Sequence, residues 1–327
     1  MLKRIKVVPL AAESLGVRSM CTYVETPDVR VVLDAGVSVC PNRFGLPPHP
    51  KEFEAIIEAR RRIAEAAQKA QVITISHYHY DHHTPSYEDW LVNWTEPDET
   101  ARQIYQEKIV LAKNPRENIN SSQRERAWMF TRTGGKYAQS IQNADNKTFI
   151  FGQTNLRFSE AVFHGPDKSQ LGWVIMVVIE TGNEKFLFAS DVQGPISRRP
   201  LEIITEEAPQ MLMIGGPPLY LSPVNVTEKE IQKGLSNLTE IVKRVPHVIL
   251  DHHITRDENW REKTIDLFYE AYKTGSIIQT AAEFLGRQDN LLEASRKKLF
   301  AENAPSRDFE NWMKTNDDAK RHTKPPI

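Results

Sequence analysis

Short apolar runs bounded by turn residues recur along this chain, together with longer segments of helical periodicity. Runs rich in Val, Ile, Tyr and Phe are typical of strands, and they lie at 3–8, 20–33, 72–75, 148–151, 156–163, 173–179, 185–189, 211–214 and 248–250. Apolar residues three and four positions apart predict helices over 50–67, 227–245 and 259–273. The pattern indicates a mixed α/β fold whose first strands are antiparallel.

Two of these helices have recognisable starts. Pro50 is placed for the first turn of its helix, and His49 before it is expected to be a loop or cap residue and not a ligand. Thr227 and Glu230 have the spacing of a capping box, in which each side chain accepts a hydrogen bond from the other residue's backbone. Both starts therefore support the helices that the periodicity predicts.

Residues 84–147 show no strand pattern and predict a helical insertion that begins at Thr84-Pro85. The insertion begins acidic, turns basic over 102–136, and carries the aromatic residues Trp90, Trp94, Trp128 and Phe130. Basic residues among aromatics can bind single-stranded nucleic acid. The alternative is a helical segment whose aromatics pack and whose charges are solvated.

The end of the chain, 276–327, predicts one or two short helices and a polar tail. The expected organisation is a main domain over 1–275, which contains the insertion 84–147, followed by a C-terminal helical extension over 276–327.

Composition narrows the function classes. The chain of 327 residues has 42 basic and 43 acidic side chains, so its net charge of -1 gives no whole-molecule attraction to nucleic acid. Cys21 and Cys40 are its only cysteines, which excludes a disulfide framework and a zinc site built on thiolates alone. The apolar run 173–179 is far shorter than the roughly 20 residues of a membrane span. We expect a cytoplasmic protein without a membrane partner.

The stretch that follows the strand 72–75 has an unusual density of metal-binding side chains, namely His77, His79, Asp81, His82 and His83. In an extended backbone His77 and His79 point to the same side and can close on one cation. Asp81 and His82 supply an oxygen and a nitrogen that suit another divalent ion. The stretch therefore predicts a two-metal site.

Polar residues also follow other predicted strands directly. These residues are Asp34, His164, Asp191 and His252. Strand ends gather along one edge of a sheet, where sites are commonly built. We therefore expect these side chains to converge with His77 and its neighbours.

This ordered set, with an Asp, then His-x-His-x-Asp-His, a single His, a single Asp and a final His, resembles the metallo-β-lactamase superfamily. The resemblance covers roughly the first 275 residues and implies a four-layer αββα sandwich with the site at one edge. More narrowly, the segments 14–19, 45–50 and 77–83 resemble an archaeal family of predicted metal-dependent hydrolases whose substrate is not known.

The resemblance implies two metal positions, the first held by His77, His79 and His164 and the second by Asp81, His82 and His252. Asp191 would bridge the two ions, and Asp34 would orient ligands. A nitrogen and oxygen ligand set without thiolate favours two zinc ions, although manganese or iron remains an alternative. His252 is preferred to His253 as the last ligand, because only one of two adjacent residues can point inward from an extended strand.

Two departures bear on the activity. The flavodiiron branch of the superfamily has a Glu where this chain has His79, which favours hydrolysis over oxygen chemistry. The Gly-Gly that often follows the motif in ribonuclease Z, glyoxalase II and lactonases is replaced by His83-Thr84-Pro85. The substrates of those enzymes therefore do not transfer to this chain.

The expected activity is metal-assisted hydrolysis, in which two ions share a water, make hydroxide near neutral pH and polarise the scissile bond. Asp81 would also orient the hydroxide, and His83, His253 and Tyr220 are candidate proton donors. A phosphodiester, in a nucleic acid or a small nucleotide, is the first choice of substrate, and a lactone or thioester is the second. The alternative of another class is a non-enzymatic metal-binding protein on the same fold. The sequence does not predict the oligomeric state.

Overall fold

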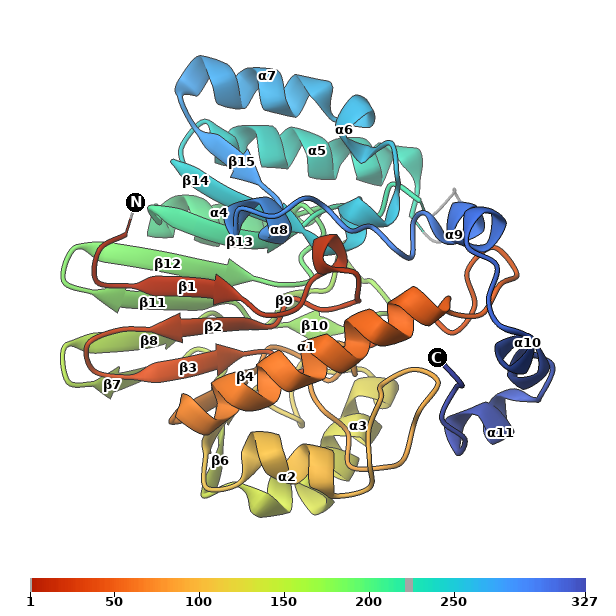
Figure 1. Ribbon diagram of the computed structural model, residues 1–327. Helices are drawn as coiled ribbons and strands as arrows, with labels where there is room; N and C mark the ends of the chain where they lie inside the picture. Colours follow the sequence, from red (N-terminus) through yellow and green to blue (C-terminus); the bar gives the residue numbers. More distant parts are fainter. Residues whose placement is uncertain (1, 221–225) are drawn as a thin grey trace.

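The computed structural model describes residues 2–220 and 226–327, and it contains two β-sheets packed face to face with helices on both outer faces (Figure 1). Three groups of buried apolar side chains separate the four layers. One lies between the sheets and joins residues such as Val31 and Phe186, and the other two lie beneath the outer helices. This is the αββα sandwich that the resemblance implies.

The first sheet has its strands in chain order, β1-β2-β3-β4-β5-β6. β1, β2 and β3 pair antiparallel, which confirms the prediction for the N-terminal strands, and β3 to β6 pair parallel. The strands are β1 (Lys6–Pro9), β2 (Thr22–Glu25), β3 (Arg30–Leu33), β4 (Val72–Ile75), β5 (Ile109–Ala112) and β6 (Ser140–Asn143).

The second sheet has the order β15-β14-β13-β12-β11-β8-β7, with β12 to β15 parallel and the rest antiparallel. Its strands are β7 (Thr148–Phe151), β8 (Thr154–Phe158), β11 (Val177–Thr181), β12 (Glu184–Ala189), β13 (Met211–Gly215), β14 (His247–Asp251) and β15 (Ile277–Gln279). A separate antiparallel pair consists of β9 (Val162–Phe163) and β10 (Trp173–Val174).

The first sheet is covered by α1 (Pro50–Lys69), α2 (Glu99–Tyr105) and α3 (Ser121–Arg132), and the second by α4 (Arg198–Glu207), α5 (Glu228–Val242), α6 (Trp260–Lys263) and α7 (Ile265–Thr274). The chain then forms α8 (Ala281–Phe284), α9 (Arg296–Glu302), α10 (Arg307–Met313) and α11 (Asp317–Arg321), and three short 3₁₀ turns are η1 (Glu13–Leu15), η2 (Gly134–Tyr137) and η3 (His252–Arg256). No helix among the described residues is long and apolar enough to cross a membrane.

The helix starts agree with the sequence. His49 caps α1, since its Nδ1 accepts a hydrogen bond from the Lys51 backbone at 3.2 Å and Glu52 accepts one from the His49 backbone at 2.8 Å. Thr227 and Glu230 form the expected capping box at the start of α5. Each box satisfies two backbone donors that a bare helix end would leave without partners.

The prediction of a purely helical segment over 84–147 is wrong. β5 and β6 lie within it and extend the first sheet beyond β4. The apolar run of β5 is only four residues long and is enclosed by Lys108 and Lys113, so it does not stand out in a charged segment. Thr84-Pro85 starts no helix, because the Thr84 side chain is buried against Arg60 and the Ala35 carbonyl in a loop.

The C-terminal residues also differ from expectation. β15 lies just beyond residue 275 and pairs with β14, so this part of the chain belongs to the second sheet, and four short helices follow in place of one or two. The sequence missed β15 because it has three residues and stands at a sheet edge. The division of the chain at 275 into a domain and an extension stays a prediction.

Candidate metal centre

The loop 76–83 leaves the end of β4 in a tight turn. The backbone N–H groups of His82 and His83 both donate to the His79 carbonyl, at 3.0 and 3.1 Å. Gly36 packs against this turn so closely that a Cβ at position 36 would lie 2.2 Å from the His83 nitrogen. Glycine at position 36 therefore lets the segment after β3 pass the turn and bring Asp34 behind it.

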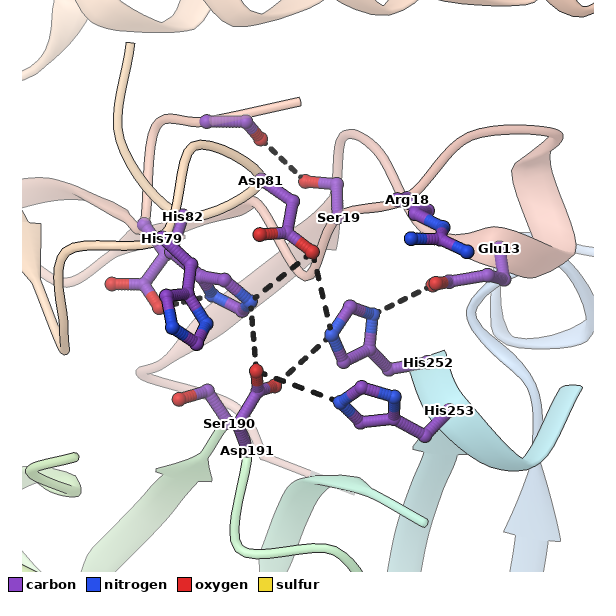
Figure 2. Close-up of polar contacts among 12 residues, drawn as sticks. Glu13, Arg18, Ser19, His79, Asp81, His82, Ser190, Asp191, His252 and His253 are labelled. Atoms are coloured by element: carbon purple, nitrogen blue, oxygen red, sulfur yellow. Dashed lines mark hydrogen bonds and ion pairs between the residues drawn. The ribbon is translucent and has the colours of Figure 1, made fainter. Parts of the chain in front are cut away.

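The carboxylate of Asp191, just after β12, lies at the centre of the site. Asp191 Oδ2 is 2.8 Å from His164 Nε2, 3.3 Å from His77 Nε2 and 3.4 Å from His82 Nε2. Asp191 Oδ1 is 3.0 Å from His252 Nε2 (Figure 2). The ends of β4, β9, β12 and β14 thus meet at one point, as the sequence predicts for their polar residues.

The spacing of these atoms fits shared metal ions. Two ligand atoms on a tetrahedral zinc ion are about 3.4 Å apart, given bonds of about 2.1 Å. The imidazole Nε2 atoms of His77, His82 and His164 are buried, and apart from the one Asp191 oxygen that they share they have no hydrogen-bond partner. A buried polar atom without a partner is costly, and a bound cation would satisfy all three.

Four groups of side chains among the described residues meet the geometric requirement for an ion, and two of them, Asp34 with His77 and His82, and Asp191 with His252 and His253, overlap the other two. His77, His79, His164 and Asp191 form one group, with all ligand atoms within 4.8 Å of one another. Asp81, His82 and His252 form another, in which Asp81 Oδ2 lies 4.0 Å from His82 Nε2 and 3.9 Å from His252 Nε2. The structure therefore brings together the residues that the resemblance assigned to each of two positions.

Hydrogen bonds on the far side of the rings hold these histidines in place. His82 Nδ1 lies 2.8 Å from Asp34 Oδ2, and Asp34 Oδ1 accepts a hydrogen bond from the Ser76 backbone at 2.7 Å. His252 Nδ1 lies 2.8 Å from Glu13 Oε2. When one ring nitrogen carries the proton and donates it in a hydrogen bond to a carboxylate, the other ring nitrogen has a free lone pair. That lone pair faces the centre and can bind a metal ion. Asp34 therefore occupies the orienting place that the sequence suggested.

Burial and the neighbouring charges together set the protonation of the centre. Desolvation and the neighbouring His82 lower the pKa of His77 to about 3, so its ring is neutral near pH 7. Burial also lowers the pKa of His252, but Glu13 and Asp191 outweigh that effect and raise the pKa to about 9. Since a metal ligand must be an unprotonated nitrogen, an ion at His252 would have to displace a proton.

The expectation that only one of His252 and His253 can point inward is wrong. The strand β14 ends at Asp251, and His252, with φ 65°, begins the 3₁₀ turn η3. Alternation holds only along extended backbone, so the turn directs both rings to Asp191, with His253 Nε2 at 3.6 Å. His253 is buried, and neither of its ring nitrogens has a hydrogen-bond partner.

The other two candidate proton donors, His83 and Tyr220, contact neighbours of the centre. His83 Nδ1 lies 2.9 Å from the His79 carbonyl, and its buried ring packs 5.1 Å from the ring of Tyr80 and 5.8 Å from that of Phe130. Burial lowers the pKa of His83 to about 3. The Tyr220 hydroxyl accepts a hydrogen bond from Arg256 Nη1 at 3.0 Å. Neither side chain belongs to a group with metal-binding geometry among the described residues.

Sequence reasoning missed Glu13 and Arg256. Both are buried, Glu13 Oε1 accepts a hydrogen bond from Arg256 Nε at 2.7 Å, and Arg256 Nη2 lies 3.8 Å from Asp81 Oδ2. The position of Arg256, four residues after His252, is the one local signal that could have indicated it. Glu13 is 239 residues from its histidine in sequence, and nothing near it suggests the contact.

Distant solved structures resemble the chain in part. A diiron β-hydroxylase from Streptomyces venezuelae has a TM-score of 0.49 at 13% identity, covering 86% of this chain and 53% of its own. A diphosphatase from the PhnP family has a TM-score of 0.42 at 12% identity, covering 76% and 87%. The layers and strand order, not these superpositions, assign the fold.

No family model matches the chain. A UPF0282 protein of Methanopyrus kandleri is 43% identical over 302 residues, which cover 91% of this chain and 100% of that protein. A UPF0282 protein of Thermococcus gammatolerans is 45% identical over 296 residues, covering 90% and 95%. One from Methanocaldococcus jannaschii is 43% identical over 297 residues, covering 90% and 96%. The fold is an αββα sandwich of two mixed sheets, and the chain belongs to the archaeal UPF0282 family.

Proposed function

We propose that this protein is a hydrolase that uses two divalent metal ions held on either side of Asp191. Three buried imidazole nitrogens carry this proposal, because all lie within 3.4 Å of one Asp191 oxygen and have no other hydrogen-bond partner. In the proposed site His77, His79 and His164 hold one ion, Asp81, His82 and His252 hold the other, and Asp191 is shared. Imidazole and carboxylate ligands without thiolate favour zinc, and they also suit manganese or iron.

Bound ions would lower the pKa of a water molecule and polarise the bond to be cleaved. Asp81 is suited to orient that water, because its side chain is 18% exposed while His82 and His252 are fully buried. A water reaching the centre therefore meets the Asp81 carboxylate at the solvent side. Of the three candidate proton donors, His253 lies nearest to the shared carboxylate, with its Nε2 3.6 Å from Asp191 Oδ2.

Arg126 supports an anionic substrate. This residue is half-buried on α3, its guanidinium lies 5.1 Å from the ring centre of Tyr80, and Tyr80 stands between His79 and Asp81 in the loop. Among the described residues no carboxylate pairs with Arg126 within 4.0 Å, whereas most arginines near the site are paired. An arginine without a carboxylate partner can bind a phosphate, so we propose a phosphodiester as the substrate class.

The outer face of α3 favours a nucleic acid over a small phosphodiester. Trp90, Trp94 and Phe130 of the insertion pack inside the protein, but Trp128 is 54% exposed and Arg132 lies 4.7 Å from its ring centre. Arg124, one turn earlier, is also exposed. An exposed ring between arginines can stack a base while the arginines attract the backbone.

The two alternatives, a lactone or thioester hydrolase and a non-enzymatic metal-binding protein, require different features of the site. A lactone or thioester is uncharged at the reacting carbonyl, so Arg126 would have no anion to bind. A non-enzymatic metal-binding protein would need the ligands but no access for a substrate, although His79 and Asp81 are only partly buried. These observations support the phosphodiester proposal over both alternatives.

A substrate panel tests the proposal. Protein loaded with zinc, manganese or iron would be assayed on bis(p-nitrophenyl) phosphate, short single-stranded RNA, an acyl lactone and an acyl thioester, beside His79→Ala under the same conditions. We expect metal-dependent cleavage of the phosphodiesters and its loss in the variant. Turnover of the neutral esters alone would reverse the choice of substrate, and a metal-loaded protein inert on all four would favour the non-enzymatic alternative.

A further inference from the structure

We infer that Glu13 is a positioning residue that makes the second metal position possible, by holding His252 with a charged hydrogen bond. The inference rests on the proposed two-metal site. Glu13 lies in η1, near the N-terminus, and is 5% exposed. Its Oε2 is 2.8 Å from His252 Nδ1, and the opposite ring nitrogen lies 3.0 Å from Asp191 Oδ1 (Figure 2). The contact fixes the proton on Nδ1 and leaves Nε2 to face the centre.

The two metal positions differ in what stands behind their histidines. In the second position both rings are backed by buried carboxylates, Asp34 behind His82 and Glu13 behind His252. In the first position the known partners are neutral: the Ser76 hydroxyl lies 3.0 Å from His77 Nδ1, and the Gln193 amide lies 3.4 Å from His164 Nδ1.

A carboxylate behind an imidazole makes the ring a stronger electron donor and fixes its orientation, and losing such a partner typically weakens metal binding by about 10–100-fold. A neutral hydroxyl or amide supplies orientation without the charge. The affinity of the second position should therefore depend on Glu13, while that of the first should not.

Arg256 holds Glu13 in this role. Its Nε and Nη2 lie 2.7 and 2.5 Å from Glu13 Oε1, opposite the oxygen that faces His252. The guanidinium also rests against the His252 ring, with Nη2 at 3.4 and 3.5 Å from the two ring nitrogens. Because Nη2 is also 3.8 Å from Asp81 Oδ2, the Glu13–Arg256 pair contacts two of the three side chains assigned to the second position.

The test compares metal binding in three variants of the full chain. Glu13→Gln removes the charge behind His252, and Glu13→Gln/Arg256→Met also removes the arginine that the first change would leave buried without its partner. Glu52→Gln is the matched control: Glu52 is buried and forms two hydrogen bonds with buried Arg296, at 2.7 and 2.8 Å, and it contacts no histidine of the centre. The control therefore leaves buried Arg296 without its carboxylate partner and changes no residue of the metal centre.

The readout is the affinity for each of two equivalents of Zn²⁺, measured against a competing chelator, with the visible absorption of Co²⁺-loaded protein as a second signal. We expect two equivalents in wild type and in Glu52→Gln. Both Glu13 variants should bind the first equivalent normally and the second 10–100-fold more weakly. If Glu13→Gln does not fold, the double variant alone decides, since it leaves no unpaired buried charge.

Undiminished second-site binding in Glu13→Gln would overturn the inference. Recovery of second-site binding in the double variant would overturn it as well. The weaker binding in Glu13→Gln would then come from Arg256 left without a partner and not from the lost carboxylate. A wild-type protein that binds no metal would instead overturn the proposed function, so the two failures are distinguishable.

Discussion

Asp34 stands directly behind His82, with its Oδ2 2.8 Å from the ring Nδ1 and both side chains fully buried. The same carboxylate accepts hydrogen bonds from the Ser76 backbone and hydroxyl. Asp34 thus ties the end of β3 to the first residue after β4. This contact joins the sheet framework to the candidate metal centre.

Asp34→Asn should weaken binding of the second metal equivalent by about 10–100-fold, because it removes the charge behind His82. Asparagine tolerates the left-handed backbone of this residue, with φ 51°, so the loss would reflect the site and not local strain. Chelator competition measures it. Asp145→Asn, which takes a carboxylate from buried Lys113, should keep wild-type metal affinity; equal affinities in all three proteins would contradict the role of Asp34.

Gly36→Ala should destabilise the protein and abolish metal binding together. The new Cβ would lie 2.2 Å from the His83 nitrogen and 2.5 Å from the His82 nitrogen, so the loop with the ligands must move. Gly45→Ala is the comparison, since its Cβ meets open space and its cost comes from φ of +78° alone. Urea unfolding and metal content would be measured for both. Full metal binding by Gly36→Ala would show that the loop yields without disturbing the ligands.

The acid stability of the protein should depend on Glu293. Burial raises the pKa of Glu293, but Arg18, Arg256 and Arg296 outweigh this and lower it to about 2. Because the folded pKa lies below the ordinary value of 4.5, the stabilisation is complete above pH 4.5 and is lost as the pH falls toward 2.

Glu293→Gln should therefore remove part of the acid dependence, up to about 1.4 kcal/mol per pH unit for one proton. Urea unfolding at intervals between pH 5 and pH 2 gives the free energy of unfolding of both proteins. A variant curve parallel to that of wild type would mean that Glu293 does not titrate with unfolding.

Arg126→Gln should raise KM for bis(p-nitrophenyl) phosphate about 10-fold, since a hydrogen bond to a charged group contributes about 1.5–3 kcal/mol. The kcat should change little, because Arg126 contacts Tyr80 and no proposed ligand side chain. Arg124→Gln serves as the control on the same helix. It should leave this small substrate unaffected and weaken only RNA binding; an unchanged KM in Arg126→Gln would remove the support for an anionic substrate.

The strand ends were predictable from the sequence because short apolar runs followed at once by Asp34, His77, Asp191 or His252 leave little choice of arrangement. The same runs predicted a mixed α/β fold, and the four-layer sandwich was implied by the resemblance to the metallo-β-lactamase superfamily. The pairing of β5 and β15 did not, since each is short and its strand character depends on a neighbour that the local sequence does not show. Contacts between residues far apart in sequence, such as that of Glu13 with His252, could not be predicted either, because the local sequence does not show which residues meet in the fold. His253 was missed as an inward residue because its orientation depends on one left-handed backbone angle at His252.

The central claim is that two metal ions bound around Asp191 drive hydrolysis, and a metal titration of chelator-treated protein tests it most directly. Zn²⁺ would be added back in steps while bound metal and cleavage of bis(p-nitrophenyl) phosphate are followed together. We predict that about two equivalents bind, in keeping with the ligand set of a dinuclear site, and that cleavage rises until the second is bound. Cleavage that is the same in metal-free protein, or in His79→Ala, would contradict the account.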